Sequence, residues 1–162
     1  MAHCLDSNIF IEAHRRRFPI DIVPVFWEAL EEQATRSTIL SIREVHRELL
    51  AGKDDLSSWA KAQIGWFLEN SDPATIKALG LVDKAVSARI PSYRSVAKTK
   101  FMEGADPWVI AYCKAHGHTL VTEEAAAPDS LKTVKIPDIA KALGVPVMNI
   151  NSMLRELKII FK

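Results

Sequence analysis

Residues 2–19, AHCLDSNIFIEAHRRRFP, decide the fold class because they join a short apolar strand, an acidic turn and a helix. The run AHCL predicts a buried strand, and the segment containing Ile9 and Phe10 has the composition of a helix. Asp6 stands between them. The opening of the chain therefore predicts a carboxylate at the C-terminal end of a strand.

The same succession of strand and helix returns further along the chain. RSTILSI predicts a buried strand that runs into a helix over REVHRELLAG, which ends at Gly52. Asp106 is predicted to be the N-cap of a helix whose first residue is Pro107, and HTLVT predicts the strand that follows it. The other predicted elements are helices beginning at Pro24, over 54–88 and over 137–143, a strand near 145–149 and a closing helix, with a break in the pattern over 90–105.

Strands that alternate with helices predict an α/β fold with a mostly parallel central sheet flanked by helices. In such sheets the ligand lies beyond the carboxyl ends of the strands. With 162 residues, 48% of them hydrophobic, we expect a single domain over 1–162 with a core large enough to fold unaided.

The charge balance and the cysteine content argue against several classes of protein. Lys and Arg number 21 against 20 Asp and Glu, so any binding to a polyanion must use local charge. Cys4 and Cys113 both lie in apolar stretches without a C-x-x-C spacing, which argues against a disulfide scaffold or a zinc ribbon. Neither a leader segment nor an apolar run of roughly 18 to 20 residues is present, so we expect a cytoplasmic protein without a membrane partner.

Acidic residues recur where a parallel sheet would place its site. Asp6 follows the first strand, Glu44 and Glu48 lie on the helix after the second, and Asp106 begins a helix. Glu123 and Glu124 follow HTLVT directly. Clustered carboxylates repel one another unless a cation lies among them, and oxygen ligands select Mg²⁺ or Mn²⁺. Bound metal could polarise a phosphate and activate a water, which predicts phosphodiester hydrolysis.

These strings also resemble a known family. LDSNIF is similar to the opening motif of PIN domains, and VHREL, GADPWVIAYCKAHG and TLVTEE resemble its next three acidic motifs in the same order. The tail KIPDIAKALGVPVMNINSMLREL resembles PIN-like proteins close to the VapC toxins. The resemblance spans nearly the whole chain. It implies a PIN-like three-layer sandwich, a Mg²⁺- or Mn²⁺-dependent endoribonuclease activity on RNA, and inhibition of the toxins by a partner antitoxin.

Carried over by position, the resemblance implies that Asp6, Glu48 and Asp106 are the first three metal ligands and catalytic carboxylates. Glu124 matches the fourth position, where the family commonly has aspartate, so Asp138 competes with it and with Glu123 for this role. Glu44 lies one helical turn before Glu48 and competes with it.

The substrate-binding residues expected from the sequence are Asn8, which helps to shape the first turn, and the cations Arg15, Lys98 and Lys100. A run of cations is also typical of a solvated surface. The four tryptophans are interpreted as core residues, and His46 as structural or exposed on the surface.

The sequence also has to be compared with two rival functions. A catalytically weak PIN-like module that binds RNA or a protein is the alternative favoured by the Glu-for-Asp change. A haloacid-type phosphatase or receiver-like domain is disfavoured because LDSN lacks a second aspartate two residues after the first, and the chain lacks a glycine-rich phosphate loop. The sequence leaves open whether the protein forms a homodimer and whether it is the toxin of a toxin-antitoxin pair.

Overall fold

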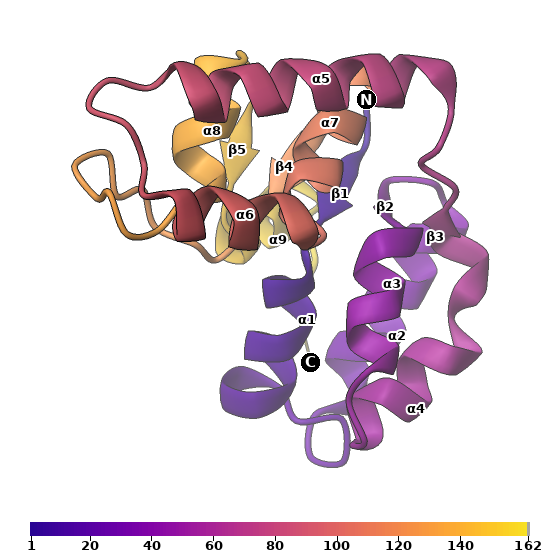
Figure 1. Cartoon of the computed structure of the whole chain (residues 1–162). Helices are drawn as coiled ribbons and strands as arrows, with labels where there is room; N and C mark the ends of the chain where they lie inside the picture. Colours follow the sequence, from indigo (N-terminus) through magenta and orange to yellow (C-terminus); the bar gives the residue numbers. More distant parts are fainter. Residues whose placement is uncertain (162) are drawn as a thin grey trace.

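A parallel sheet forms the centre of the structure, which is a computed structural model describing residues 1–161 (Figure 1). Within that range the sheet has five strands in the order β3-β2-β1-β4-β5, and each neighbouring pair is parallel. The strands are β1 (His3–Leu5), β2 (Ile39–Ile42), β3 (Phe67–Leu68), β4 (Thr119–Val121) and β5 (Val147–Met148). The predicted α/β architecture is confirmed.

Helices flank this sheet in two groups. Figure 1 shows α2, α3 and α4 on the side of β2 and β3, and α6, α7 and α8 on the side of β4 and β5. The helical segments are α1 (Ser7–Glu12), the π-helical turn η1 (Ala13–Arg17), α2 (Pro24–Thr35), α3 (Arg43–Leu50), α4 (Asp55–Ala62), the 3-10 turn η2 (Ile64–Trp66), α5 (Pro73–Ala88), α6 (Ser95–Glu103), α7 (Asp106–His116), α8 (Ile136–Ala142) and α9 (Ile150–Glu156). Among residues 1–161, none of these helices combines the length and the apolar character needed to cross a bilayer.

The three inner strands determine where the site lies. Every residue of β1, β2 and β4 is buried, as expected for strands of a parallel sheet that is covered on both faces. Leu5 of β1 pairs with Val121 of β4, so the residues that follow them, Asp6 and Thr122, emerge side by side. The C-terminal edge of the sheet thus brings together segments that are more than a hundred residues apart in the sequence.

Aromatic side chains form the core beneath α1 and α4. The ring of Phe10 lies within 6 Å of the rings of Trp59, Trp66 and Phe67, and Trp27 packs edge-on against Trp59. Trp27 is almost fully buried, while the other three tryptophans are partly buried against the core. The interpretation of the tryptophans as core residues is confirmed, and the two free cysteines are buried as expected.

The structure corrects three predictions about local structure. Residues 95–103 form α6, although the sequence pattern predicts a break there, and the helical region predicted over 54–88 contains the short strand β3. Asp106 is not an N-cap, because it is already the first helical residue of α7 and Ala105 precedes it as the cap. The carboxylate of Asp106 therefore makes no capping hydrogen bond.

Candidate functional site

Asp6 lies at the centre of the site, directly after β1. Its side chain is fully buried, and its polar partners are two hydroxyls. The Ser7 hydroxyl donates to Oδ1 at 3.3 Å and the Thr122 hydroxyl donates to Oδ2 at 3.0 Å. Burial raises the pKa of Asp6 to about 7, the Thr122 hydrogen bond opposes this rise, and the charges of Glu124 and Glu48 add to it. Asp6 is therefore a carboxyl group whose ionised form lacks compensating positive charge.

Glu48 reaches the same place from α3. Its Oε2 accepts a hydrogen bond from the Ser7 hydroxyl at 2.5 Å, and its Oε1 accepts one from the backbone N–H of Ala105 at 3.0 Å. Ser7 has a single hydroxyl proton, so it can donate to Asp6 or to Glu48 but not to both at once. Through these contacts Glu48 joins the start of α1 to the start of α7.

Asp106 begins α7 beside this junction. Burial raises the pKa of Asp106 to about 8, and the negative charges of Asp6, Glu124 and Glu48 raise it further, while Lys135 opposes the rise. Two of these three acidic neighbours, Glu124 and Glu48, also raise the pKa of Asp6. The raised pKa values of both aspartates thus have one cause, which is the confinement of several carboxylates in a poorly hydrated place.

Glu124 comes from the segment after β4. Its backbone N–H donates to the Thr122 hydroxyl at 3.1 Å, so Thr122 links Glu124 to Asp6. Its Oε2 accepts from the backbone N–H of Ile136 at 2.8 Å, and its Oε1 lies 3.9 Å from Nζ of Lys135. Glu124 therefore faces the site while it is also held by the first turn of α8.

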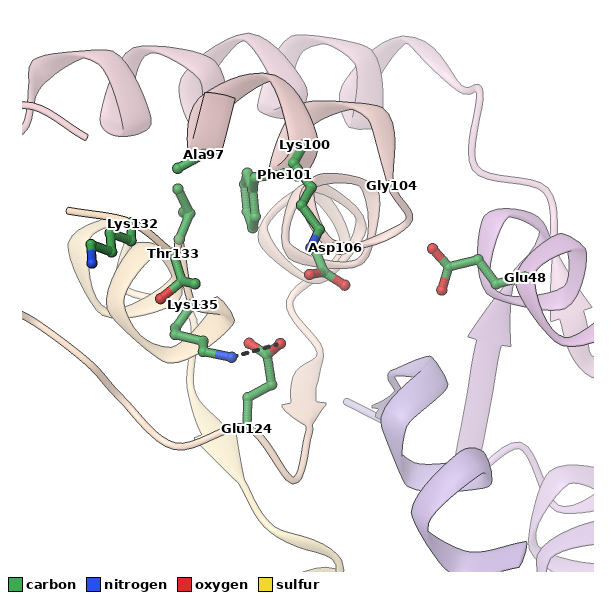
Figure 2. A pocket seen from close by; sticks show the side chains of 11 residues that line it. Glu48, Ala97, Lys100, Phe101, Gly104, Asp106, Glu124, Lys132, Thr133 and Lys135 are labelled. Atoms are coloured by element: carbon green, nitrogen blue, oxygen red, sulfur yellow. Dashed lines mark ion pairs between the residues drawn. The ribbon is translucent and has the colours of Figure 1, made fainter. Parts of the chain in front are cut away.

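A cavity of about 410 Å³ is lined by three of these acidic groups, Glu48, Asp106 and Glu124, whereas the fully buried Asp6 does not line it (Figure 2). Glu48 and Asp106 line one end of it, and Figure 2 shows Lys132 and Thr133 at the opposite end, with Phe101 between the two ends. The remaining lining residues are Ala97, Lys100, Gly104, Glu124, Val134 and Lys135. Lys132 and Glu48 thus lie at opposite ends of the cavity, and Lys100 and Lys135 approach it between these ends.

The other predicted residues lie away from this cavity. Glu44 pairs with Arg47 at 2.6 Å, and Asp138 accepts from the backbone N–H of Ala127 at 2.9 Å and borders a different cavity. Glu123 accepts from the backbone N–H of Ile150 at 2.9 Å and pairs with Arg17 at 3.1 Å. Asn8, Arg15 and Lys98 do not line the cavity, whereas Lys100 does.

His46 lies between Glu44 and Glu48 in the sequence of α3; it is buried, and one of its ring nitrogens lies 2.8 Å from the carbonyl oxygen of Ala60. Of the two roles expected for it, structural or exposed on the surface, the burial of His46 favours the structural one.

Sequence analysis did not identify Lys132, Thr133 and Lys135 as site residues. They belong to the stretch LKTVK at 131–135, between the last acidic motif and α8. Two lysines in a short polar loop that follows an acidic motif were the available signal. Their relevance depends on the path of the loop, which the sequence pattern does not specify.

The chemistry of these donors fits a hard divalent cation. The acidic groups and the hydroxyls that contact them offer oxygen ligands only, which Mg²⁺ and Mn²⁺ prefer. Among residues 1–161, no three His, Cys, Asp or Glu side chains already converge as a complete metal-binding group. Mg²⁺ is usually held by one or two carboxylates, with waters and substrate phosphate completing its shell. An open arrangement in which one or two of these carboxylates contact the ion is therefore compatible with Mg²⁺ and less so with cations that need an all-protein cage.

Comparisons with known proteins agree with this architecture. The profile of a family described as "Domain of unknown function (DUF4411)" matches residues 3–161. A solved structure with a similar fold is that of VapBC2 from Rickettsia felis bound to a DNA fragment from its promoter, at a TM-score of 0.53. The two chains are 15% identical, and the match covers 92% of this chain and 98% of the other. A search of curated proteins found no significant match.

Proposed function

This chain belongs to the family described as a domain of unknown function (DUF4411), and we propose that it is a divalent-metal-dependent endoribonuclease. The observation that carries the proposal is the chain of hydrogen bonds at the C-terminal edge of the sheet. It connects Asp6 through Ser7 to Glu48, and through Thr122 to Glu124. The fold shared with a chain of VapBC2 and the resemblance of the acidic motifs to those of PIN domains support the same assignment.

In this proposal Asp6 and Asp106 bind the cation directly. Glu48 and Glu124 add further negative charge around it. A bound Mg²⁺ or Mn²⁺ supplies positive charge to the scissile phosphate and activates a water for attack on phosphorus. Thr122 fixes the orientation of the Asp6 carboxylate by donating to its Oδ2, and the Ser7 hydroxyl, within reach of both Asp6 and Glu48, holds the two carboxylates together. Glu48, rather than Glu44, is assigned to the site because its carboxylate contacts Ser7 and the start of α7.

Cation binding would also explain why carboxylates with raised pKa values are gathered at this site. Carboxylates that are buried among like charges are destabilised in their ionised form. A divalent cation offsets this repulsion, so the ionised forms of Asp6 and Asp106 become favourable when it binds. The site is thus arranged to release protons on taking up metal.

The proposal is tested by cleavage of structured and single-stranded RNAs in Mg²⁺, in Mn²⁺ and in chelator. We expect the wild type to cut in either metal and not in chelator. Asp6→Asn and Asp106→Asn should each lose about 100-fold or more in rate, because each removes a charge that holds the metal. Asp83→Asn, an exposed aspartate on α5, is the matched control. Equal rates in all four proteins would refute the assignment.

A second candidate function is a catalytically weak PIN-like module that binds RNA or a protein. It is favoured by the two contacts of Glu124, which occupy its carboxylate with the Ile136 N–H and Lys135. Mn²⁺ binding without RNA cleavage in the same assay would select this alternative.

We further propose that the protein is the toxin of a toxin-antitoxin pair, with an antitoxin as its protein partner. The similar fold in a VapBC2 structure supports this extension. Controlled expression in a bacterial host should arrest growth, and the Asp106→Asn variant should not. Growth that is unaffected by a wild-type protein shown to be an active nuclease would contradict the toxin role while leaving the nuclease proposal intact.

A further inference from the structure

A second cavity, of about 620 Å³, shares loop 125–135 with the cavity of the site. The loop contributes Ala126 and Pro128 to this second cavity, and Lys132 and Lys135 to the first. The other walls come from the end of α5 and from α8, two helices that pack against each other (Figure 1). None of the four acidic residues of the site lines the second cavity, so it is a separate place for a ligand.

Small apolar residues form most of the walls that solvent can reach. They are partly or fully exposed, and they are Ala85, Ala88, Ala126, Pro128, Pro137 and Ala142. Alanine and proline have no side chain long enough to fill the space between the helices and the loop. An apolar group that enters the cavity therefore covers apolar surface that water otherwise contacts, which favours binding.

The loop wall of this cavity is held by hydrogen bonds from both helices. The guanidinium of Arg89, at the end of α5, donates to the carbonyl oxygens of Pro128 and Ser130. Oδ2 of Asp138, in α8, accepts from the backbone N–H of Ala127 at 2.9 Å. The cavity is therefore formed before any ligand enters it, and the donors of Arg89 are already engaged.

Asp138 and Lys141 bring opposite charges to one wall of the cavity. They are three residues apart on α8, so their Cβ atoms lie on the same face of the helix, about 5–6 Å from each other. Among residues 1–161, Oδ1 of Asp138 accepts no hydrogen bond, and neither side chain has an ion-pair partner within 4.0 Å. Each charge can thus take a ligand group without first breaking an ion pair.

We infer that this second cavity binds a small zwitterion with an apolar body, of the class of an aromatic or large aliphatic α-amino acid. Its ammonium donates to Oδ1 of Asp138, its carboxylate accepts from Nζ of Lys141, and its side chain lies against the alanines of α5. The volume of about 620 Å³ lies in the range of roughly 300–1,000 Å³ typical of small-ligand sites. The inference goes beyond the proposed nuclease function and does not depend on it.

Occupancy should reach the site through the shared loop. A ligand in contact with Ala126 and Pro128 adds to the interactions that hold loop 125–135, so local opening of the loop becomes rarer. The same backbone carries Lys132 and Lys135 at the cavity of the site. The ligand of the second cavity is therefore an effector, and the backbone amides of the loop should exchange hydrogen more slowly when it is bound.

Binding is measured by an NMR titration of the isotope-labelled full chain with L-phenylalanine as the probe. A Kd of about 1 mM or below is expected for a ligand of this size. Phenylalaninamide lacks the carboxylate and N-acetylphenylalanine lacks the ammonium, so each should bind about tenfold more weakly or worse. L-alanine, which has both charges but no large apolar body, should not bind measurably.

Two charge variants test the contacts of the ligand with α8. Asp138→Asn should weaken phenylalanine binding about tenfold, and it keeps an oxygen that can accept from the Ala127 N–H. Asp129→Asn, the same change at an exposed position of the loop, is the matched control and should bind like the wild type. Lys141→Gln should weaken the binding of phenylalanine but not of phenylalaninamide, because the amide has no carboxylate to lose.

A second pair of variants tests the cavity itself. Ala88→Phe places a large side chain at an exposed position that lines the cavity and should abolish binding, whereas Ser87→Phe, at the neighbouring exposed position outside it, should not. Equal affinities of these two variants, equal binding of phenylalanine and its two analogues, or no binding of phenylalanine, leucine or tryptophan at millimolar concentration would each overturn the inference. Unchanged hydrogen exchange of the loop in the saturated protein would overturn the effector role. The test uses neither RNA nor metal, so its failure is distinct from a failure of the proposed nuclease function.

Discussion

Replacing Asp6 by asparagine should stabilise the metal-free protein at alkaline pH. Asp6 is fully buried, and its pKa rises from 3.8 to about 7 in the folded state, chiefly through burial. A group whose folded pKa is raised gives its full stability below the unfolded pKa, and this stability is lost as the pH rises through the folded pKa. At pH 8 the folded chain therefore carries the whole cost of an ionised Asp6.

The magnitude follows from the pKa rise. A rise of about three pH units at about 1.4 kcal/mol for each corresponds to an upper limit of about 4 kcal/mol at pH 8. Asparagine keeps the size of the side chain and removes the charge. Its amide nitrogen cannot accept a hydrogen bond from a hydroxyl as the carboxylate oxygen does, so part of the benefit is lost. We therefore expect the free energy of unfolding at pH 8 to increase by about 1–3 kcal/mol. For a chain of this length, each kcal/mol changes Tm by roughly 2–4 °C.

The assay is thermal unfolding followed by circular dichroism in chelator at pH 5 and at pH 8. Asp6→Asn should have the higher Tm at pH 8, and its advantage should shrink at pH 5, where Asp6 of the wild type is largely protonated. Asp83→Asn on α5 should match the wild type at both values. An Asp6→Asn variant that unfolds below the wild type at pH 8, or a gain that is equal at both pH values, would refute this electrostatic reasoning.

Three other predictions follow from the same structure. Mn²⁺ affinity measured by calorimetry should increase between pH 6 and pH 8, because Asp6 and Asp106 must lose protons whose pKa values are about 7 and about 8; a flat profile would argue against both as ligands. Ser7→Ala removes a hydroxyl that bridges two carboxylates, so urea unfolding should show a loss of about 1–2 kcal/mol, and RNA cleavage should slow about tenfold. Phe10→Ala should cost about 3–5 kcal/mol in urea unfolding, whereas Val96→Ala, at an exposed position, should stay within about 0.5 kcal/mol.

Sequence patterns predicted the elements whose signals are local. The apolar run before Asp6 and the β-branched run of β2 identified inner strands because strands buried on both faces are apolar throughout. Pro24 marked the first residue of α2 because its fixed φ and missing N–H suit that position. The parallel arrangement then placed the ends of β1 and β4 together, which explains why Asp6 and the segment after β4 could be assigned to one place.

Other features depend on tertiary packing and left little trace in the sequence. The strand β3 has two residues, too few for a period to be recognised, and it forms because β2 offers it a partner. The helix α6 has a weak apolar stripe, and the prolines and glycine around it conceal it. Glu44 and Glu48 share one face of α3, so only the position of Ser7 and the start of α7 distinguishes them. The lysines of loop 125–135 become relevant only through the path of that loop.

The measurement that tests the central claim most directly is anomalous diffraction from crystals of the wild type soaked in Mn²⁺. We expect a peak about 2.1 Å from a carboxylate oxygen of Asp6 and of Asp106, at the C-terminal edge of the sheet, and no such peak in Asp106→Asn. Crystals that take up no Mn²⁺ at this place, or that bind it only at a site without Asp6 and Asp106, would contradict the account.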